Sequence, residues 1–91
     1  MPSEPGLTIL HVVRHLDDAE ALAVARAQQT AGHQVTLLLL QDAVLDRPDF
    51  AGPILACAED NQARGSRSPY PAVSYEDIVR LVFEHQRVIS W

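Results

Sequence analysis

Lysine is absent from this sequence, and its seven basic residues are all arginines. Schiff-base catalysis and phosphate-loop nucleotide binding both depend on a lysine, so both activities are excluded. The arginines are scattered along the chain and the net charge is −5, so no basic stripe exists for a nucleic-acid backbone to follow. We therefore expect no direct nucleic-acid partner.

Cysteine is nearly absent, because Cys57 is the only thiol in 91 residues. A single cysteine excludes an internal disulfide framework and leaves no cluster of soft metal ligands. The four histidines contain no His-x-x-x-His pair within an expected helix, and the four glycines form no phosphate-binding loop. We expect neither a metal nor an organic cofactor.

Long apolar runs are also missing, so no segment is expected to cross a membrane. Residues 1–6 lack the basic and then apolar order of a secretory signal peptide. Both features predict a cytoplasmic protein. The hydrophobic content of 47% supports one domain over residues 1–91, but so short a chain buries limited apolar area, which favours association with other subunits.

Apolar, β-branched runs alternate with helical patterns along the chain. Strands are expected at 7–13, 35–40, 54–56 and 87–91, helices at about 19–31, at 58–64 and after 74, and a helical turn at 43–45. Asp17 or Asp18 is expected to cap the first helix, Asp42 the short turn, and Ser74 with Asp77 forms a capping box. This alternation predicts a three-layer α/β domain with a mainly parallel sheet flanked by helices.

Two segments follow strands at the edge where parallel sheets place reactive groups. Arg14 and His15 come after the first strand, and Cys57 comes after the third. In the common doubly wound order with the first strand central, these two strands are neighbours. The order therefore predicts that Arg14 or His15 lies near the thiol.

Cys57 has two interpretations, because it stands where a strand gives way to a short helix. The helix dipole favours a reactive thiolate, whereas Glu59 and Asp60 in the first turn oppose it. Asp60 is also spaced to pair with Arg64 on one helix face. The alternative is that Cys57 is a small buried apolar side chain, as unpaired cysteines often are.

Other histidine and aromatic side chains are expected to have structural roles. His11 should be packed and hydrogen-bonded within a strand, His33 solvated in a loop, and His85 favoured as a cation at a helix end. Tyr75 and Trp91 should serve in packing or in a subunit interface.

Four segments and two single residues carry a resemblance to a known family. They are Leu10-His11-Val12-Val13-Arg14, Leu37-Leu38-Leu39-Leu40-Gln41-Asp42-Ala43-Val44, Glu59-Asp60 with Ala63-Arg64-Gly65, and Ser74-Tyr75-Glu76-Asp77-Ile78-Val79, followed by His85 and Trp91. On these residues the chain resembles the DsrE/DsrF/DsrH sulfur-relay proteins, and within them the DsrH and TusB branch.

The resemblance implies a DsrE-like fold and assembly with DsrE-like and DsrF-like sister subunits or with itself. It also implies transfer of persulfide sulfur between protein cysteines, either toward tRNA 2-thiouridine or in oxidative sulfur metabolism. DsrH-type proteins carry a cysteine in the loop after the first strand, where this chain has Arg14-His15-Leu16. Cys57 falls instead where DsrE and TusD subunits carry the sulfur-accepting cysteine.

Three functions follow as hypotheses. In the first, the chain is a sulfurtransferase subunit that exchanges sulfur with donor and acceptor proteins, in which Cys57 carries persulfide and Arg14 and His15 support the thiolate. In the second, it is a non-catalytic structural subunit of such a complex and Cys57 is buried. In the third, it is a small homo-oligomeric protein that binds a ligand in a closed apolar pocket at the strand ends.

Overall fold

The computed structural model describes residues 6–91, whose elements follow one another in a regular alternation. They are β1 (Thr8–Val13), α1 (Ala19–Thr30), β2 (Gln34–Leu39), the 3₁₀ helix η1 (Gln41–Leu45), β3 (Ile54–Cys57), α2 (Ala58–Ala63), β4 (Ala72–Val73), α3 (Tyr75–Glu84) and β5 (Arg87–Ser90). The expectation for the first residues of the chain falls largely on 1–5, which lie outside this range. Within residues 6–91 no helix is long and apolar enough to cross a membrane.

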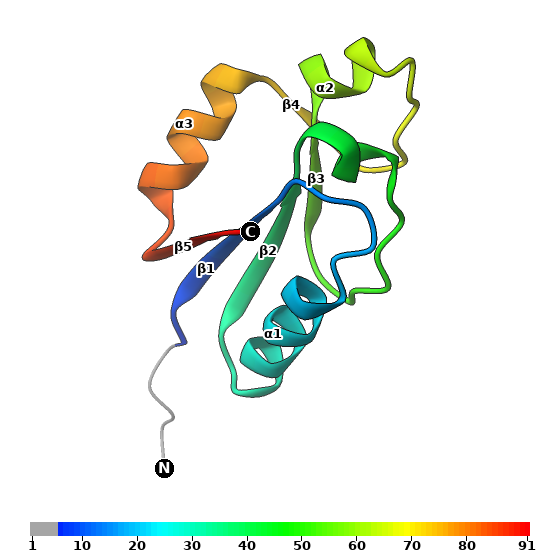
Figure 1. The fold of residues 1–91 in the computed structure, drawn as a ribbon. Coiled ribbons are helices and arrows are strands. Elements are labelled where there is room, and N and C mark those ends of the chain that lie inside the picture. The colour runs from blue at the N-terminus through cyan, green and yellow to red at the C-terminus, as the bar shows by residue number, and fades with distance from the viewer. Residues whose placement is uncertain (1–5) are drawn as a thin grey trace.

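Five strands form one sheet in the order β4-β3-β2-β1-β5, and every pair of neighbours is parallel. The predicted α/β class, with a parallel sheet flanked by helices, is therefore confirmed (Figure 1). The predicted adjacency of the first and third strands is wrong, because β2 stands between them. Each connection from β1 to β4 steps one strand in the same direction, and only the connection through α3 returns to the other side of β1.

Side chains of each strand alternate between the two faces of the sheet, and both faces are covered. On one face, Leu10, Val12 and Leu38 are buried beneath α3, which contributes Ile78 and Leu81. The opposite face carries the larger cluster, into which α1 packs (Figure 1). Coverage of both faces explains the three consecutive buried leucines, Leu37 to Leu39, at the end of β2.

Helix α1 lies close to the sheet because its inward positions are alanines. Ala21 and Ala25 are at most 1% exposed and contact the larger cluster. Of the two aspartates expected to cap this helix, Asp18 does so, since its Oδ1 accepts a hydrogen bond from the amide of Ala21 at 3.0 Å. Gly32 follows the helix at a φ of 96°, a conformation that glycine adopts readily.

Helix α3 begins at the predicted capping box. The Ser74 hydroxyl accepts from the Asp77 amide, and the Asp77 carboxylate accepts from the Ser74 amide, both at 3.2 Å. Hydrogen bonds from Ser74 to the carboxylate, chiefly the one from its amide, hold the pKa of Asp77 below its usual value. The last strand ends at Ser90, and Trp91 lies just beyond it.

Candidate functional site

Cys57 is the last residue of β3 and the N-cap of α2, which confirms the strand-to-helix junction. The residue is fully buried, at 0% exposure. Its Sγ donates a hydrogen bond to Glu59 Oε1 at 3.7 Å. The thiol is thus covered from solvent and faces a carboxylate rather than a cation.

The pKa of the Cys57 thiol is raised above its ordinary value, and burial is the main cause. The amides of Asp60 and Glu59 lower this pKa, whereas the negative charge of Asp60 raises it further. Burial prevails over the amides. The site therefore favours the neutral thiol, which is a poor nucleophile.

Arg14 and His15 lie at the end of β1, and β2 separates them from the strand that carries Cys57. Two strand spacings amount to about 10 Å. The Arg14 guanidinium is engaged elsewhere, since its Nε donates to the main-chain oxygen of Trp91 at 2.8 Å. The observed strand order therefore removes the adjacency on which the predicted thiolate support by Arg14 and His15 was based.

Asp60 is the centre of the polar network beside Cys57. Its Oδ2 accepts from the Gln41 amide at 2.7 Å, and its Oδ1 accepts from the Tyr75 hydroxyl at 2.8 Å. One carboxylate, only 8% exposed, therefore joins η1, α2 and α3. Gln41 has a φ of 52°, and the bond to Asp60 holds its amide in this unusual left-handed conformation.

The pKa of Asp60 reflects opposing effects. Burial alone would raise it, but hydrogen bonds from the Gln41 amide, the Tyr75 hydroxyl and the Cys57 thiol, together with the charge of Arg64, lower it below its usual value. The same bond acts in reverse on the phenol, and the pKa of Tyr75 is raised to about 12. The network is consequently stable with an ionised Asp60 and a neutral Tyr75.

The charged side chains near Asp60 pair differently from the pairing that the sequence predicts. Arg64 Nε pairs with Asp42 at 3.0 Å, although the chain spacing had suggested Asp60. No side-chain hydrogen bond caps η1, so the capping role expected of Asp42 is wrong. The pairing brings the start of η1 onto α2, a contact between segments 22 residues apart that helical spacing does not reveal.

His11 and Trp91 form a second network, centred on the buried His11 of β1. His11 is 0% exposed, and the Trp91 indole N–H donates to its Nδ1 at 2.9 Å. The Nε2 of His11 is hydrogen-bonded to Gln28 Oε1, and the His11 and Trp91 rings stack with centroids 6.0 Å apart. The packed roles predicted for His11 and Trp91 are confirmed.

The two other histidines that were assigned roles also have partners. His85 is the C-cap of α3, and its Nδ1 donates to the main-chain oxygen of Leu81 at 2.7 Å. His33 Nδ1 accepts a hydrogen bond from the Leu7 amide at 3.1 Å, so this side chain is half-buried rather than solvated. Within residues 6–91 no three His, Cys, Asp or Glu side chains gather as a metal site.

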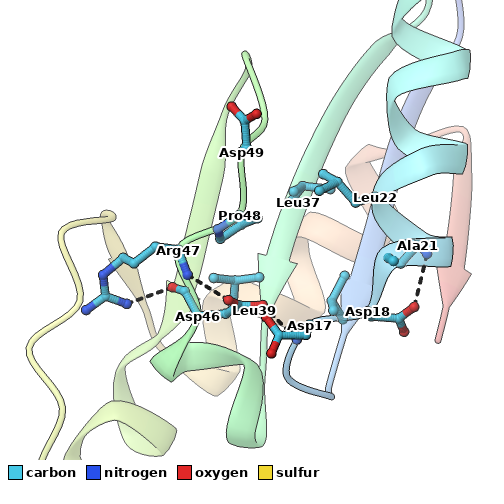
Figure 2. Close-up of a pocket in the computed structure, with 12 residues that line it drawn as sticks. Asp17, Asp18, Ala21, Leu22, Leu37, Leu39, Asp46, Arg47, Pro48 and Asp49 are labelled. Carbon is cyan, nitrogen blue, oxygen red and sulfur yellow. Dashed lines mark hydrogen bonds between the residues drawn. The ribbon is translucent and has the colours of Figure 1, made fainter.

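A hollow of about 250 Å³ lies beyond the ends of β1 and β2, beside α1 (Figure 2). Its apolar wall includes Val13, Leu22, Leu37 and Leu39, and its rim carries Asp17, Asp18, Asp46 and Asp49. Three rim carboxylates are occupied: Asp18 caps α1, Asp46 accepts from the Asp17 amide, and Asp49 pairs with Arg26. An open, acid-rimmed hollow differs from the closed apolar pocket that the ligand-binding hypothesis requires.

No protein-family model matches the chain, and no curated protein matches its sequence.

The burial of Cys57 leads to a first expected result. Alkylation of the native protein by iodoacetamide at neutral pH should be more than about tenfold slower than alkylation of the unfolded chain, because the thiol is covered and protonated. A Cys57→Ala/Ala23→Cys variant moves the single thiol to an exposed position of α1 and should react rapidly when folded. Equal rates for native and unfolded wild type would contradict the buried site.

Proposed function

We propose that this chain is a structural, non-catalytic subunit of a cytoplasmic sulfur-relay assembly of the DsrH/TusB kind. Another subunit then carries the persulfide, and this one holds that subunit in place. The observation that supports this role is the buried Cys57, whose neighbours are carboxylates. The sulfur pathway itself rests on the family resemblance, with tRNA thiolation and sulfur oxidation as its two settings.

A relay cysteine has requirements that this site does not meet. Its thiolate must attack the outer sulfur of a donor persulfide. The sulfur–sulfur bond to the donor then breaks, and the donor leaves as a thiolate that takes up the proton. That exchange requires an accessible thiolate, whereas Cys57 is covered and its pKa is raised. A structural role requires only a stable fold and a docking surface.

Exposed apolar side chains on α3 supply such a surface. Phe83 is 84% exposed, and Val79 is 58% exposed. A face of this kind on a small soluble domain is typical of a binding surface. The fold thus combines an unreactive thiol with a helix that exposes Val79 and Phe83 on its outer side.

Sulfur loading distinguishes this role from that of a carrier. The purified chain and a DsrE-like subunit are each incubated with a cysteine desulfurase and cysteine that contains radioactive sulfur. We expect the DsrE-like subunit to acquire label that dithiothreitol removes, and this chain to remain unlabelled. Dithiothreitol-sensitive label on this chain that disappears in Cys57→Ser would overturn the structural role and support persulfide transfer through Cys57.

Co-expression with DsrE-like and DsrF-like subunits tests the assembly. Native mass spectrometry should detect a complex that contains all three chains and that forms equally well with the Cys57→Ala variant. If no complex forms under conditions where the two sister subunits assemble, the proposal is wrong.

A further inference from the structure

The hollow beside α1 has no part in the structural role proposed above. Its wall includes buried apolar side chains, since Val13 is 7% exposed, Leu37 2% and Leu39 1%. Leu22 and Pro48 add apolar surface that is only partly covered. The hollow lies at the carboxyl edge of a parallel sheet, which is where open α/β sheets bind their ligands. A concave apolar surface in this place is a candidate binding site.

Two contacts hold the hollow in shape. The Asp17 amide donates to Asp46 Oδ2 at 3.0 Å, which joins the loop after β1 to the end of η1. Arg26 of α1 pairs with Asp49 at 3.1 Å. Each contact ties one side of the hollow to the other, so the hollow is formed before any ligand enters, as in most binding sites for small molecules.

The charge at the rim decides which ligand suits this apolar wall. Figure 2 shows Asp17, Asp18 and Asp46 at one end of the hollow and Asp49 at the other. Arg26 offsets the charge of Asp49. The carboxylate of Asp17, in contrast, has no hydrogen-bond or ion-pair partner within residues 6–91. The end that carries three carboxylates is therefore the one that attracts a cation.

Among the described residues that line the hollow, only Arg47 is cationic, and its charge is used elsewhere. Its guanidinium donates to the main-chain oxygens of Asp46 at 2.7 Å and of Arg67 at 3.3 Å, and it lies over the ring of Tyr70. Figure 2 shows this side chain directed away from the hollow. The apolar wall concentrates the negative potential that is left.

We propose that the hollow binds a small organic cation, in which an ammonium group is attached to an apolar body. The ammonium lies among Asp17, Asp18 and Asp46, and the apolar body lies on Leu22 and Leu39. A bare metal ion suits the rim less well, because no three acidic, histidine or cysteine side chains within residues 6–91 gather around one point.

The size of the hollow limits the size of the ligand. A cavity of about 150 Å³ holds benzene, so the volume of about 250 Å³ has room for roughly ten non-hydrogen atoms. One side of the hollow is open to water, and so small a ligand makes few contacts. We therefore expect a dissociation constant of about 0.1–1 mM.

Nuclear magnetic resonance of the nitrogen-15-labelled chain tests this site. The probe is 3-phenylpropylamine, and its matched control is 3-phenylpropanol, which has nearly the same size and shape but no charge. The amine should shift the amide signals of Asp17, Leu22 and Asp46 until the site is saturated. The alcohol should bind at least about tenfold more weakly, because it lacks the attraction to the carboxylates.

Two conservative variants remove the charge of the rim and keep the fold. Asp17→Asn and Asp18→Asn should each weaken amine binding about threefold, and the double variant about tenfold. Asparagine tolerates the φ of 52° at position 17, and at position 18 it caps a helix as well as aspartate does. Glu84→Gln makes the same change in net charge on α3, which covers the opposite face of the sheet, and should leave the affinity unchanged.

Three results would overturn the proposal. The first is the absence of saturable shifts up to about 10 mM amine. The second is equal binding of the amine and the alcohol. The third is an affinity of the folded double variant that equals that of Glu84→Gln, because the attraction would then come from the net charge of the chain and not from the rim.

Discussion

Replacing His11 with alanine is expected to lower the free energy of unfolding by about 3–5 kcal/mol. His11 is fully buried, so the change leaves a cavity in the sheet face. It also removes the partner of the Trp91 indole N–H and of the Gln28 side chain. Urea denaturation followed by circular dichroism measures the loss.

The bonding pattern of His11 explains why both partners matter. An indole N–H can only donate, so the His11 Nδ1 that faces it must accept. A neutral ring then carries its hydrogen on Nε2 and donates to Gln28 Oε1. A single imidazole satisfies a donor on one side and an acceptor on the other, which no aliphatic side chain can do.

Two variants separate these contributions. Trp91→Phe keeps an aromatic ring for stacking but removes the indole donor, and should cost about 1–2 kcal/mol. His15→Ala, at an exposed position in the loop that follows β1, should change the free energy of unfolding by less than about 0.5 kcal/mol. If His11→Ala is no more destabilising than His15→Ala, the buried network does not stabilise the fold.

Asp60→Ala is the second large change, with an expected loss of about 2–4 kcal/mol. It leaves the Gln41 amide and the Tyr75 hydroxyl without their acceptor. It also releases the left-handed backbone of Gln41, so Gln41→Gly should recover part of the loss in the Asp60→Ala background. Asp42→Ala is the matched control, because its exposed ion pair with Arg64 contributes less than about 1 kcal/mol.

The stabilisation of the fold by Asp60 should disappear at low pH. Its pKa is lowered in the folded state, so its stabilisation is fully present above the unfolded pKa of about 4 and is lost as pH falls through the folded pKa. The difference between wild type and Asp60→Ala should therefore be constant near neutral pH and shrink below about pH 4. A difference that grows on acidification would contradict an ionised Asp60.

Local features of this fold were predictable because they depend on neighbours in the sequence. The capping box at Ser74, the end of α1 before Gly32 and the apolar run of β2 each rest on side chains a few positions apart. Strand β4 was missed, because Ala72 and Val73 are only two residues after a loop that contains prolines. Such a strand exists through its pairing with β3 and has little pattern of its own.

The candidate site was harder to predict because it depends on strand order. The position of Cys57 at the end of a strand was correct, but its neighbours come from segments that the sequence does not connect. Asp60 was assigned only to the first turn of a helix, whereas its partners, Gln41 and Tyr75, belong to other elements. Asp60 and Tyr75 form a network because the tertiary fold brings α2 and the start of α3 together, and no local sequence pattern indicates this contact.

The pairing of β1 with β5 also shapes how the chain folds. The Thr8 amide and the Gln86 side chain that meet there are 78 positions apart, so this contact closes a very long loop and forms slowly. Trp91, the only tryptophan, reaches His11 across the same junction. Its fluorescence therefore reports the closing of the sheet, whereas helix signals also report segments that fold from near neighbours.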